Sequence, residues 1–321
     1  MSISLRESIQ WLPDDASPSE PTSTIVLTSP GCRFVDIRVL KQQHQPSHTH
    51  TPSAALDWAF AGFSTSTPLP GGGRHSTWRH VIDSRHPFPV DVVDKGDIYP
   101  LPFPSPHPPL PQTDDDGNGS VERTLEKGRM LNPATGKVTA YEEVWLDYDT
   151  STSISIPKPQ THTHRIIVLE LGTPPHARGM LICLGGYCQS VLRSSTGEEG
   201  NSSSSSSSSS STFAAERWVF AEEDAAEEEE EGKGKDNNGN GNRKKWNWKL
   251  EFRVGPNDIR LPDPETLFRR HGLALGQEIV VGSSEEEEEE EEGPNVTTTS
   301  INGIKKGSSA KQVWTVVELE Q

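Results

Sequence analysis

The feature of this chain that most constrains its fold is the alternation of apolar and polar residues in short segments. In Val35–Val39 the three apolar residues share one face of an extended strand, and Asp36 and Arg38 share the other. A period of two is the pattern of a β-strand, because successive side chains point to opposite faces. We expect half-buried antiparallel strands, with one face on a core and the other in water.

Two segments of the C-terminal half repeat this alternation. In Trp246–Val254 every second residue is apolar, and in Gln312–Leu319 the residues Val313, Thr315, Val317 and Leu319 fall on one side. Further segments expected to form strands are Ser76–Asp83, Val138–Asp147, Arg165–Leu171, Gly179–Leu184 and Tyr187–Leu192. So many short strands predict β-barrels or β-sandwiches and not a βαβ fold.

Turn and helix signals lie between these strands. Leu131–Lys137 contains a proline and a glycine that suit a hairpin turn, and the Gly-Gly pair at 185–186 suits a tight turn. One segment indicates a helix. Asp263 fits the N-cap, proline follows it at the first helical position, and Gly272 fits the C-terminal cap. We therefore predict a short helix over Pro264–His271.

The composition shows that much of the 321-residue chain cannot join a core. Only 31% of residues are apolar, against about 45–50% in an average globular protein. Serine, glutamate, glycine and asparagine runs account for part of the difference, and we expect disordered inserts at about 196–211, 222–242 and 285–293. The remainder suffices for two modest β-barrel domains, which we assign to residues 1–150 and 151–321.

The net charge of −17 is concentrated in two runs, Glu227–Glu231 and Glu285–Glu292. No basic face competes with these runs, so we expect no binding to nucleic acid through its phosphates. The first residues lack the apolar core of a secretory signal, and no window approaches 18 consecutive apolar residues, so we expect no membrane span. These features are typical of a cytoplasmic protein.

No motif in the chain predicts catalysis or a cofactor. There is no Gly-x-Ser-x-Gly elbow, and the three cysteines are too few and too unevenly spaced for a disulfide framework. Cys183 and Cys188 are five positions apart, which does not match a zinc or redox pair, and we interpret both as structural thiols. The His-x-His pairs at 48/50 and 162/164 fall in segments expected to be loops. We assign no catalytic, cofactor or metal residues.

Tryptophans on or beside the expected strands are candidates for a ligand cavity. In a small barrel such side chains either fill the interior or line a pocket, and the alternation does not decide between the two. The four candidates are Trp58, Trp78, Trp145 and Trp248. Ser283 and Ser284 precede eight glutamates, which is a pattern that acidophilic kinases phosphorylate, so both are candidate phosphosites.

An ordered set of segments resembles a known family. The segments are Trp58-Ala59-Phe60-Ala61-Gly62, Thr77-Trp78, Asp94-Lys95-Gly96-Asp97-Ile98-Tyr99-Pro100, Tyr141-Glu142-Glu143-Val144-Trp145, Arg165–Leu171, Gly179–Leu184 and Trp314-Thr315-Val316-Val317-Glu318. In this order they are similar to the HRI family of yeasts and filamentous fungi, which is named for an interaction with a yeast casein kinase I. The long serine and glutamate inserts depart from the yeast pattern.

The resemblance implies a fold, a location and a class of function. It implies two tandem lipocalin-like (calycin-like) β-barrels in a cytoplasmic and nuclear protein without enzymatic activity. The leading hypothesis is a protein-interaction module that engages a casein-kinase-I-type kinase. The alternative is a carrier that holds a small apolar ligand inside a barrel, where burial contributes roughly 25 cal/mol per Å² of apolar area.

Overall fold

The computed structural model describes ten segments of the chain. They are residues 1–13, 17–41, 55–102, 121–149, 166–173, 177–195, 211–222, 246–270, 272–281 and 312–320. Apart from Ser211 and Glu222, the three expected inserts lie outside these segments, as do both His-x-His pairs. No helix in the described segments is long and apolar enough to cross a membrane.

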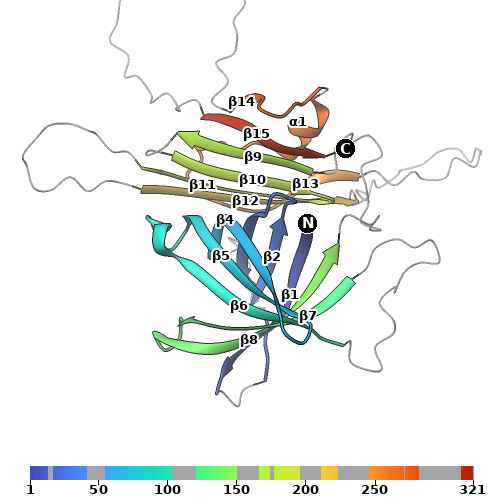
Figure 1. Ribbon diagram of the computed structural model, residues 1–321. Helices are drawn as coiled ribbons and strands as arrows, with labels where there is room; N and C mark the ends of the chain where they lie inside the picture. The colour runs from blue at the N-terminus through green and yellow to red at the C-terminus, as the bar shows by residue number, and fades with distance from the viewer. Residues whose placement is uncertain are drawn as a thin grey trace, which may run out of the picture.

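The first eight strands form a closed antiparallel barrel in which each strand pairs with its neighbour in sequence, and β1 pairs with β8 (Figure 1). All eight lie within residues 1–150. Their bounds are β1 Ser2–Leu12, β2 Thr22–Thr28, β3 Arg33–Leu40, β4 Leu56–Leu69, β5 Gly73–Asp83, β6 Val93–Pro100, β7 Val121–Asn132 and β8 Lys137–Asp149, with a 3₁₀ turn η1 at Pro89–Asp91.

The remaining strands form a curled seven-stranded antiparallel sheet in the order β13-β12-β11-β10-β9-β15-β14. Their bounds are β9 Ile166–Thr173, β10 Ala177–Leu184, β11 Tyr187–Ser195, β12 Ser211–Glu222, β13 Trp246–Val254, β14 Glu278–Val281 and β15 Gln312–Glu320, with one helix α1 at Pro264–Arg269. The all-β prediction is confirmed. In the described residues β13 and β14 are the edges of this sheet, where the sequence predicts a second closed barrel.

The sheet lies across the outside of the barrel and shares a core with it (Figure 1). Val35, Ile37 and Val39, the apolar face of the β3 alternation, point out of the barrel and are at most 7% exposed. They pack with Ile25 and Leu27 of β2 against Ile182 and Met180 of β10. The barrel is therefore apolar on part of its outside, because that surface is covered by the second sheet.

The opposite face of the sheet carries a second core. Leu169, Leu181 and Trp314 are fully buried there, and Leu267 of α1 packs with them. Figure 1 shows α1 on the side of the sheet that faces away from the barrel. Strands β9 and β10 are thus buried on both faces, which explains their nearly continuous apolar sequence.

The expected turns and helix are present. The β7–β8 hairpin turns at Asn132–Gly136, where Gly136 has a φ of 65° and the Asn132 side chain accepts a hydrogen bond from the backbone of Ala134. Asp263 caps α1 by accepting from the Thr266 backbone N–H at 2.9 Å. The helix ends at Arg269, two residues earlier than expected.

Two β-bulges correct the predicted faces. In β13 the pairing with β12 skips Glu251, so Trp248 and Phe252 lie on opposite faces of the sheet instead of the same one. In β15 the pairing with β9 skips Val317, so Leu319 packs in the same core as Trp314 and Val316, whereas Val313, expected on the face of Leu319, is 41% exposed. A bulge inserts one residue and reverses the inside-outside order after it.

The expectation of free thiols at Cys183 and Cys188 is also corrected. The two residues lie directly opposite each other in the β10–β11 hairpin and form a disulfide. Both are buried in the second core. Sequence spacing alone does not reveal this pair, because the tight turn at 185–186 is what brings the two side chains together.

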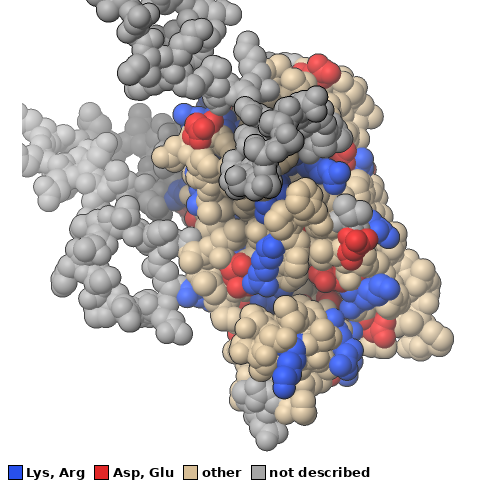
Figure 2. Space-filling model, turned by 90° about the vertical axis from the view of Figure 1, so that its left-hand side faces the viewer, with Lys and Arg blue, Asp and Glu red and all other residues tan. Residues whose placement is uncertain are grey.

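Charged side chains of both signs lie on the face of the molecule that Figure 2 shows. Figure 2 shows one face of the molecule, on which Lys and Arg side chains are interspersed with Asp and Glu. That face therefore carries no extended patch of a single sign.

Candidate ligand site in the barrel

The interior of the barrel contains a cavity of about 170 Å³ that is partly open to solvent and is lined by both polar and apolar side chains. It is lined by the residues of β1–β8 that alternate with the outward apolar ones. An eight-stranded barrel is wide enough either to be filled by side chains or to hold one small ligand. The lining consists of Ser2, Ser4, Val26, Thr28, Phe34, Asp36, Arg38, Phe60, Ser64, Ser66, Arg74, Ser76, Trp78, Asp94, Ile98, Thr124, Glu126, Met130, Tyr141, Glu143, Trp145 and Asp147.

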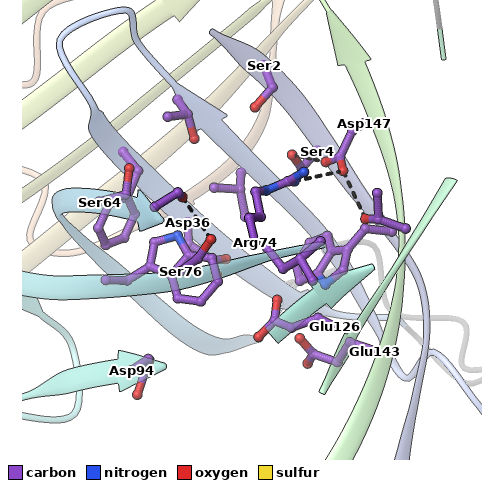
Figure 3. Close-up of a pocket in the computed structure, with 18 of the residues that line it drawn as sticks. Ser2, Ser4, Asp36, Ser64, Arg74, Ser76, Asp94, Glu126, Glu143 and Asp147 are labelled. Carbon is purple, nitrogen blue, oxygen red and sulfur yellow. Dashed lines mark hydrogen bonds and ion pairs between the residues drawn. The ribbon is translucent and has the colours of Figure 1, made fainter. Parts of the chain in front are cut away.

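A hydrogen-bonded group surrounds Asp147 at one part of the lining. Its carboxylate accepts from Ser4 Oγ at 2.5 Å and from Thr124 Oγ1 at 2.9 Å, and Arg74 Nη2 lies 3.7 Å away. Figure 3 shows Ser4, Arg74 and Asp147 converging from different strands. These contacts satisfy Asp147 within the protein.

Two acidic residues face each other at another part of the lining (Figure 3). Glu126 of β7 and Glu143 of β8 are directly opposite in the strand register, and both are buried. Tyr141 donates a hydrogen bond to Glu126 at 2.6 Å. Gly128 leaves the space that Tyr141 occupies, because a Cβ there would overlap the phenol oxygen. Like charges directly opposite on neighbouring strands are unfavourable unless one of them is protonated or paired.

The two carboxyl groups are in different electrostatic environments. Arg6 donates to Glu143 at 2.6 Å and to Glu20 at 2.6 Å, so Glu143 has a buried cationic partner. Burial and then repulsion from Glu143 raise the pKa of Glu126 to about 8, although the hydrogen bond from Tyr141 opposes this shift. Glu126 is therefore largely protonated at neutral pH.

Two buried polar atoms in the lining have no hydrogen-bond partner in the part of the chain that the structure describes. Asp36 is 3% exposed, and its Oδ2 accepts from Arg38 at 2.8 Å while its Oδ1 is unpartnered. Trp145 is 7% exposed, and its indole Nε1 is unpartnered. Leaving such a group unpaired costs about 1–3 kcal/mol, and an explanation for each is therefore required.

A buried histidine completes the wall beside the cavity. His80 is hydrogen-bonded through Nδ1 to Asp83 at 2.7 Å and through Nε2 to Asp94 at 3.1 Å. Burial lowers the pKa of His80, but the bonds to Asp83 and Asp94 outweigh it and raise the pKa above its ordinary value. Asp83 is held further by the indole N–H of Trp58 at 3.0 Å.

The pKa of Glu126 predicts how stability depends on pH. In the folded protein Glu126 keeps a proton that the unfolded chain, with a pKa near 4.5, releases. The free energy of unfolding should therefore fall as the pH rises from about 4.5 to about 8. We expect Glu126→Gln to remove this loss, amounting to roughly 4 kcal/mol, in urea unfolding at pH 5.0 and 8.5.

The matched control is Glu122→Gln, which makes the same change at an exposed position of the same strand. This variant should keep the wild-type pH dependence. If the wild type and Glu126→Gln lose the same stability between the two pH values, Glu126 is not the buried acid responsible.

The structure places the four candidate tryptophans at three different sites. Trp78 and Trp145 line the cavity. Trp58 is buried beside it in an aromatic cluster with Phe34 and Phe60. Trp248 lies in the second core, where its ring is stacked on that of Phe268 with 5.5 Å between the ring centroids. It does not line the barrel cavity. Ser283 and Ser284 lie outside the described residues.

Sequence reasoning misses the polar residues that give the cavity its chemistry. The alternation assigns Asp36 and Arg38 to a water-facing side, but both lie inside the barrel and are at most 8% exposed. The sequence feature that could have indicated a polar barrel interior is the alternation of charged residues with valine and isoleucine in this strand.

Within the described residues, no group of three His, Cys, Asp or Glu side chains is placed to hold a metal ion.

Comparison with known proteins shows the family. The family model described as Protein HRI1 matches residues 2–287, which is most of the chain. The chain belongs to this family. Comparison with curated proteins gives no significant match.

A solved structure supports the fold. The chain resembles the crystal structure of an uncharacterized protein from Saccharomyces cerevisiae with a TM-score of 0.53 and 16% sequence identity. The alignment covers 100% of this chain and 99% of the yeast chain. At this identity the likeness concerns the fold alone, so the arrangement of barrel and sheet is common to both proteins.

Proposed function

We propose that this member of the family is a non-catalytic binding protein that holds a small molecule inside the β1–β8 barrel, in the manner of a lipocalin. The observation that supports the proposal most directly is the pair of unpartnered atoms, Asp36 Oδ1 and Trp145 Nε1, in the lining of one partly open cavity. A ligand that offers one donor and one acceptor would satisfy both.

The size and lining of the cavity limit the ligand. A cavity of about 150 Å³ holds a benzene-sized molecule, and this one measures about 170 Å³. Serine, threonine and charged side chains make up most of the lining. These properties favour a small ligand that carries hydrogen-bonding groups on an apolar body such as a ring, whereas the sequence suggests a purely apolar ligand.

The site is proposed for binding and not for catalysis. Its histidine and two of its nearby arginines are each held in hydrogen bonds to carboxylates, in the pairs His80–Asp83, Arg38–Asp36 and Arg6–Glu143. These groups are already paired within the protein and can hold a ligand in a fixed orientation. The proposed location of the protein is the cytoplasm and the nucleus, as the resemblance to the family implies.

A fragment screen by ligand-observed NMR tests the proposal. The library should contain equal numbers of cationic, anionic and neutral molecules with about one ring each. We expect binders that are lost in Val26→Phe, which fills the cavity from β2. They should be retained in Thr65→Phe, which adds the same bulk at an exposed position of β4. Binding that survives Val26→Phe unchanged, or a screen without binders, would refute the proposal.

A second candidate function is the protein interaction that the family name implies, and one observation favours it. In the described residues β14 has a single neighbouring strand, β15, and forms an edge of the sheet. Val280 of β14 and Val313 of β15 are paired in register and are 56% and 41% exposed. An exposed edge of this kind can accept an additional strand from a partner. We propose an extended segment of a casein-kinase-I-type kinase as that partner.

A binding measurement with purified casein kinase I tests this second candidate. We expect Val280→Lys to weaken binding by at least about tenfold, which corresponds to about 1.4 kcal/mol. The control is Leu131→Lys, at a position that is 60% exposed on the β7–β8 hairpin and far from β14 in the fold. Equal affinities of wild type and Val280→Lys would exclude this edge as the docking site.

A further inference from the structure

The balance of charges around the cavity indicates which ligands it admits. Among the residues that the structure describes, five carboxyl groups and two guanidinium groups line the cavity. The carboxyl groups are those of Asp36, Asp94, Glu126, Glu143 and Asp147, and the guanidinium groups are those of Arg38 and Arg74.

The groups that pair with this lining from behind do not reverse the excess. Arg6 and His80 add two cations, but Glu20 and Asp83 bind these same cations and add two carboxylates. Even with Glu126 neutral and His80 protonated, six carboxylates face four cations. An anion entering this cavity meets net repulsion, whereas a cation meets net attraction, and the low dielectric of the interior strengthens both effects.

Two further observations point to an ammonium group in particular. Asp36 Oδ1 is a buried acceptor without a donor among the described residues, and a primary ammonium supplies a charge-assisted N–H to such an oxygen. Trp78, which is half-buried, presents aromatic surface to the same cavity. Aromatic faces attract ammonium groups through their quadrupole.

The remaining unpartnered atom adds a second requirement. The Trp145 indole can only donate a hydrogen bond, and its Nε1 has no acceptor in the segments that the structure describes. Resting on the proposed binding function, we infer that the cavity selects a small organic cation. Its primary ammonium donates to Asp36 Oδ1, and an acceptor elsewhere on the same molecule receives the Trp145 N–H.

The acidic pair links this binding to pH. Glu126 faces Glu143 and Tyr141 of β8, Arg38 of β3 and Asp94 of β6. A bound cation would favour the ionised form of Glu126, so binding should release a proton and strengthen as the pH rises toward 8. Glu126→Gln should abolish both effects.

Matched probes test the charge requirement on the full chain by calorimetry. Benzylamine, benzyl alcohol and benzoate have nearly the same shape and differ in charge. We expect benzylamine to bind at least about tenfold more tightly than either of the others. Asp36→Asn should remove this preference, whereas Asp97→Asn, the same change on the outer surface beside His75, should not.

A second set of probes tests the acceptor. The three aminomethylpyridines replace one ring C–H of benzylamine by a nitrogen acceptor at different positions. We expect one isomer to bind about threefold or more tightly than benzylamine, and Trp145→Phe to remove that advantage while keeping benzylamine affinity. This variant keeps the inference testable if Asp36→Asn does not fold.

The outcomes separate this inference from the function on which it rests. Equal or tighter binding of benzyl alcohol or benzoate would overturn the selection for cations, but the proposal that the barrel binds a small molecule would stand. A fragment screen by NMR that yields no binder of any charge would overturn the binding function itself. Tighter binding of benzylamine that Asp36→Asn does not change would overturn the role assigned to Asp36.

Discussion

Replacing Trp314 by alanine should cost about 4 kcal/mol of unfolding free energy, which is the largest effect that we expect from a single substitution. Trp314 is 0% exposed and is the largest fully buried side chain in the described residues. Its ring lies over Gly179 of β10, where a Cβ would overlap it. The ring therefore occupies the space that the absent side chain of Gly179 leaves.

Urea unfolding followed by circular dichroism measures this effect. The matched control is Val313→Ala, one residue earlier in β15 but 41% exposed, which should change stability by about 0.5 kcal/mol or less. Trp314→Phe provides a milder variant, with an expected loss of about half that of alanine, if the alanine variant does not fold. A loss below about 1 kcal/mol for Trp314→Ala would contradict the position of this ring in the core.

Replacing Arg217 by alanine should cost about 3 kcal/mol, because this residue joins the second sheet to the barrel. Arg217 of β12 is 1% exposed. Its guanidinium donates to the backbone oxygen of Ile37, to the backbone oxygen of Ser23 at 3.1 Å and to Ser23 Oγ at 2.9 Å. Truncation takes these donors away from oxygens of β2 and β3, of which the Ile37 oxygen is buried and the Ser23 oxygens are half-buried.

The same unfolding measurement distinguishes this buried arginine from a surface one. Arg269→Ala removes an ion pair with Glu265 in α1 that is 77% exposed on the arginine side, and such pairs contribute about 0.5 kcal/mol or less. Arg217→Lys keeps the positive charge but has fewer hydrogen-bond donors. Its free energy of unfolding should therefore lie between those of the wild type and Arg217→Ala. If Arg217→Ala is no more destabilising than Arg269→Ala, the sheet does not depend on this contact.

The strands could be predicted from the sequence, but their surroundings could not. The alternation in Val35–Val39 identifies β3 and its apolar face correctly. What it cannot show is that this face lies outside the barrel, against Ile182 and Met180. A period of two separates two faces without saying which one water reaches, so the pattern assigns Asp36 and Arg38 to solvent although both are buried.

The faces of single strands are predictable only as far as the first bulge. Trp246–Val254 shows the most regular alternation in the chain, yet Trp248 and Phe252 lie in different cores. The extra residue that separates them, Glu251, is set by pairing with β12 across the segment 223–245. No local pattern encodes such a long-range register.

The cavity could be predicted in outline and not in its chemistry. The sequence offers four tryptophans as candidates for a barrel cavity without deciding which of them line it, and in the structure Trp78 and Trp145 do so. The acidic pair Glu126 and Glu143 requires the β7–β8 register, and the room for Tyr141 requires Gly128 opposite it. These contacts join residues of two different strands, so the local sequence pattern does not reveal them.

The central claim is that the barrel interior is a ligand site built from Asp36 and Trp145. A crystal structure of the protein purified from its own host, without added ligand, tests it most directly. We expect density of a small molecule in the cavity, within hydrogen-bonding distance of Asp36 Oδ1 and Trp145 Nε1. A cavity that contains only water, or one closed by the side chains that line it, would contradict the account.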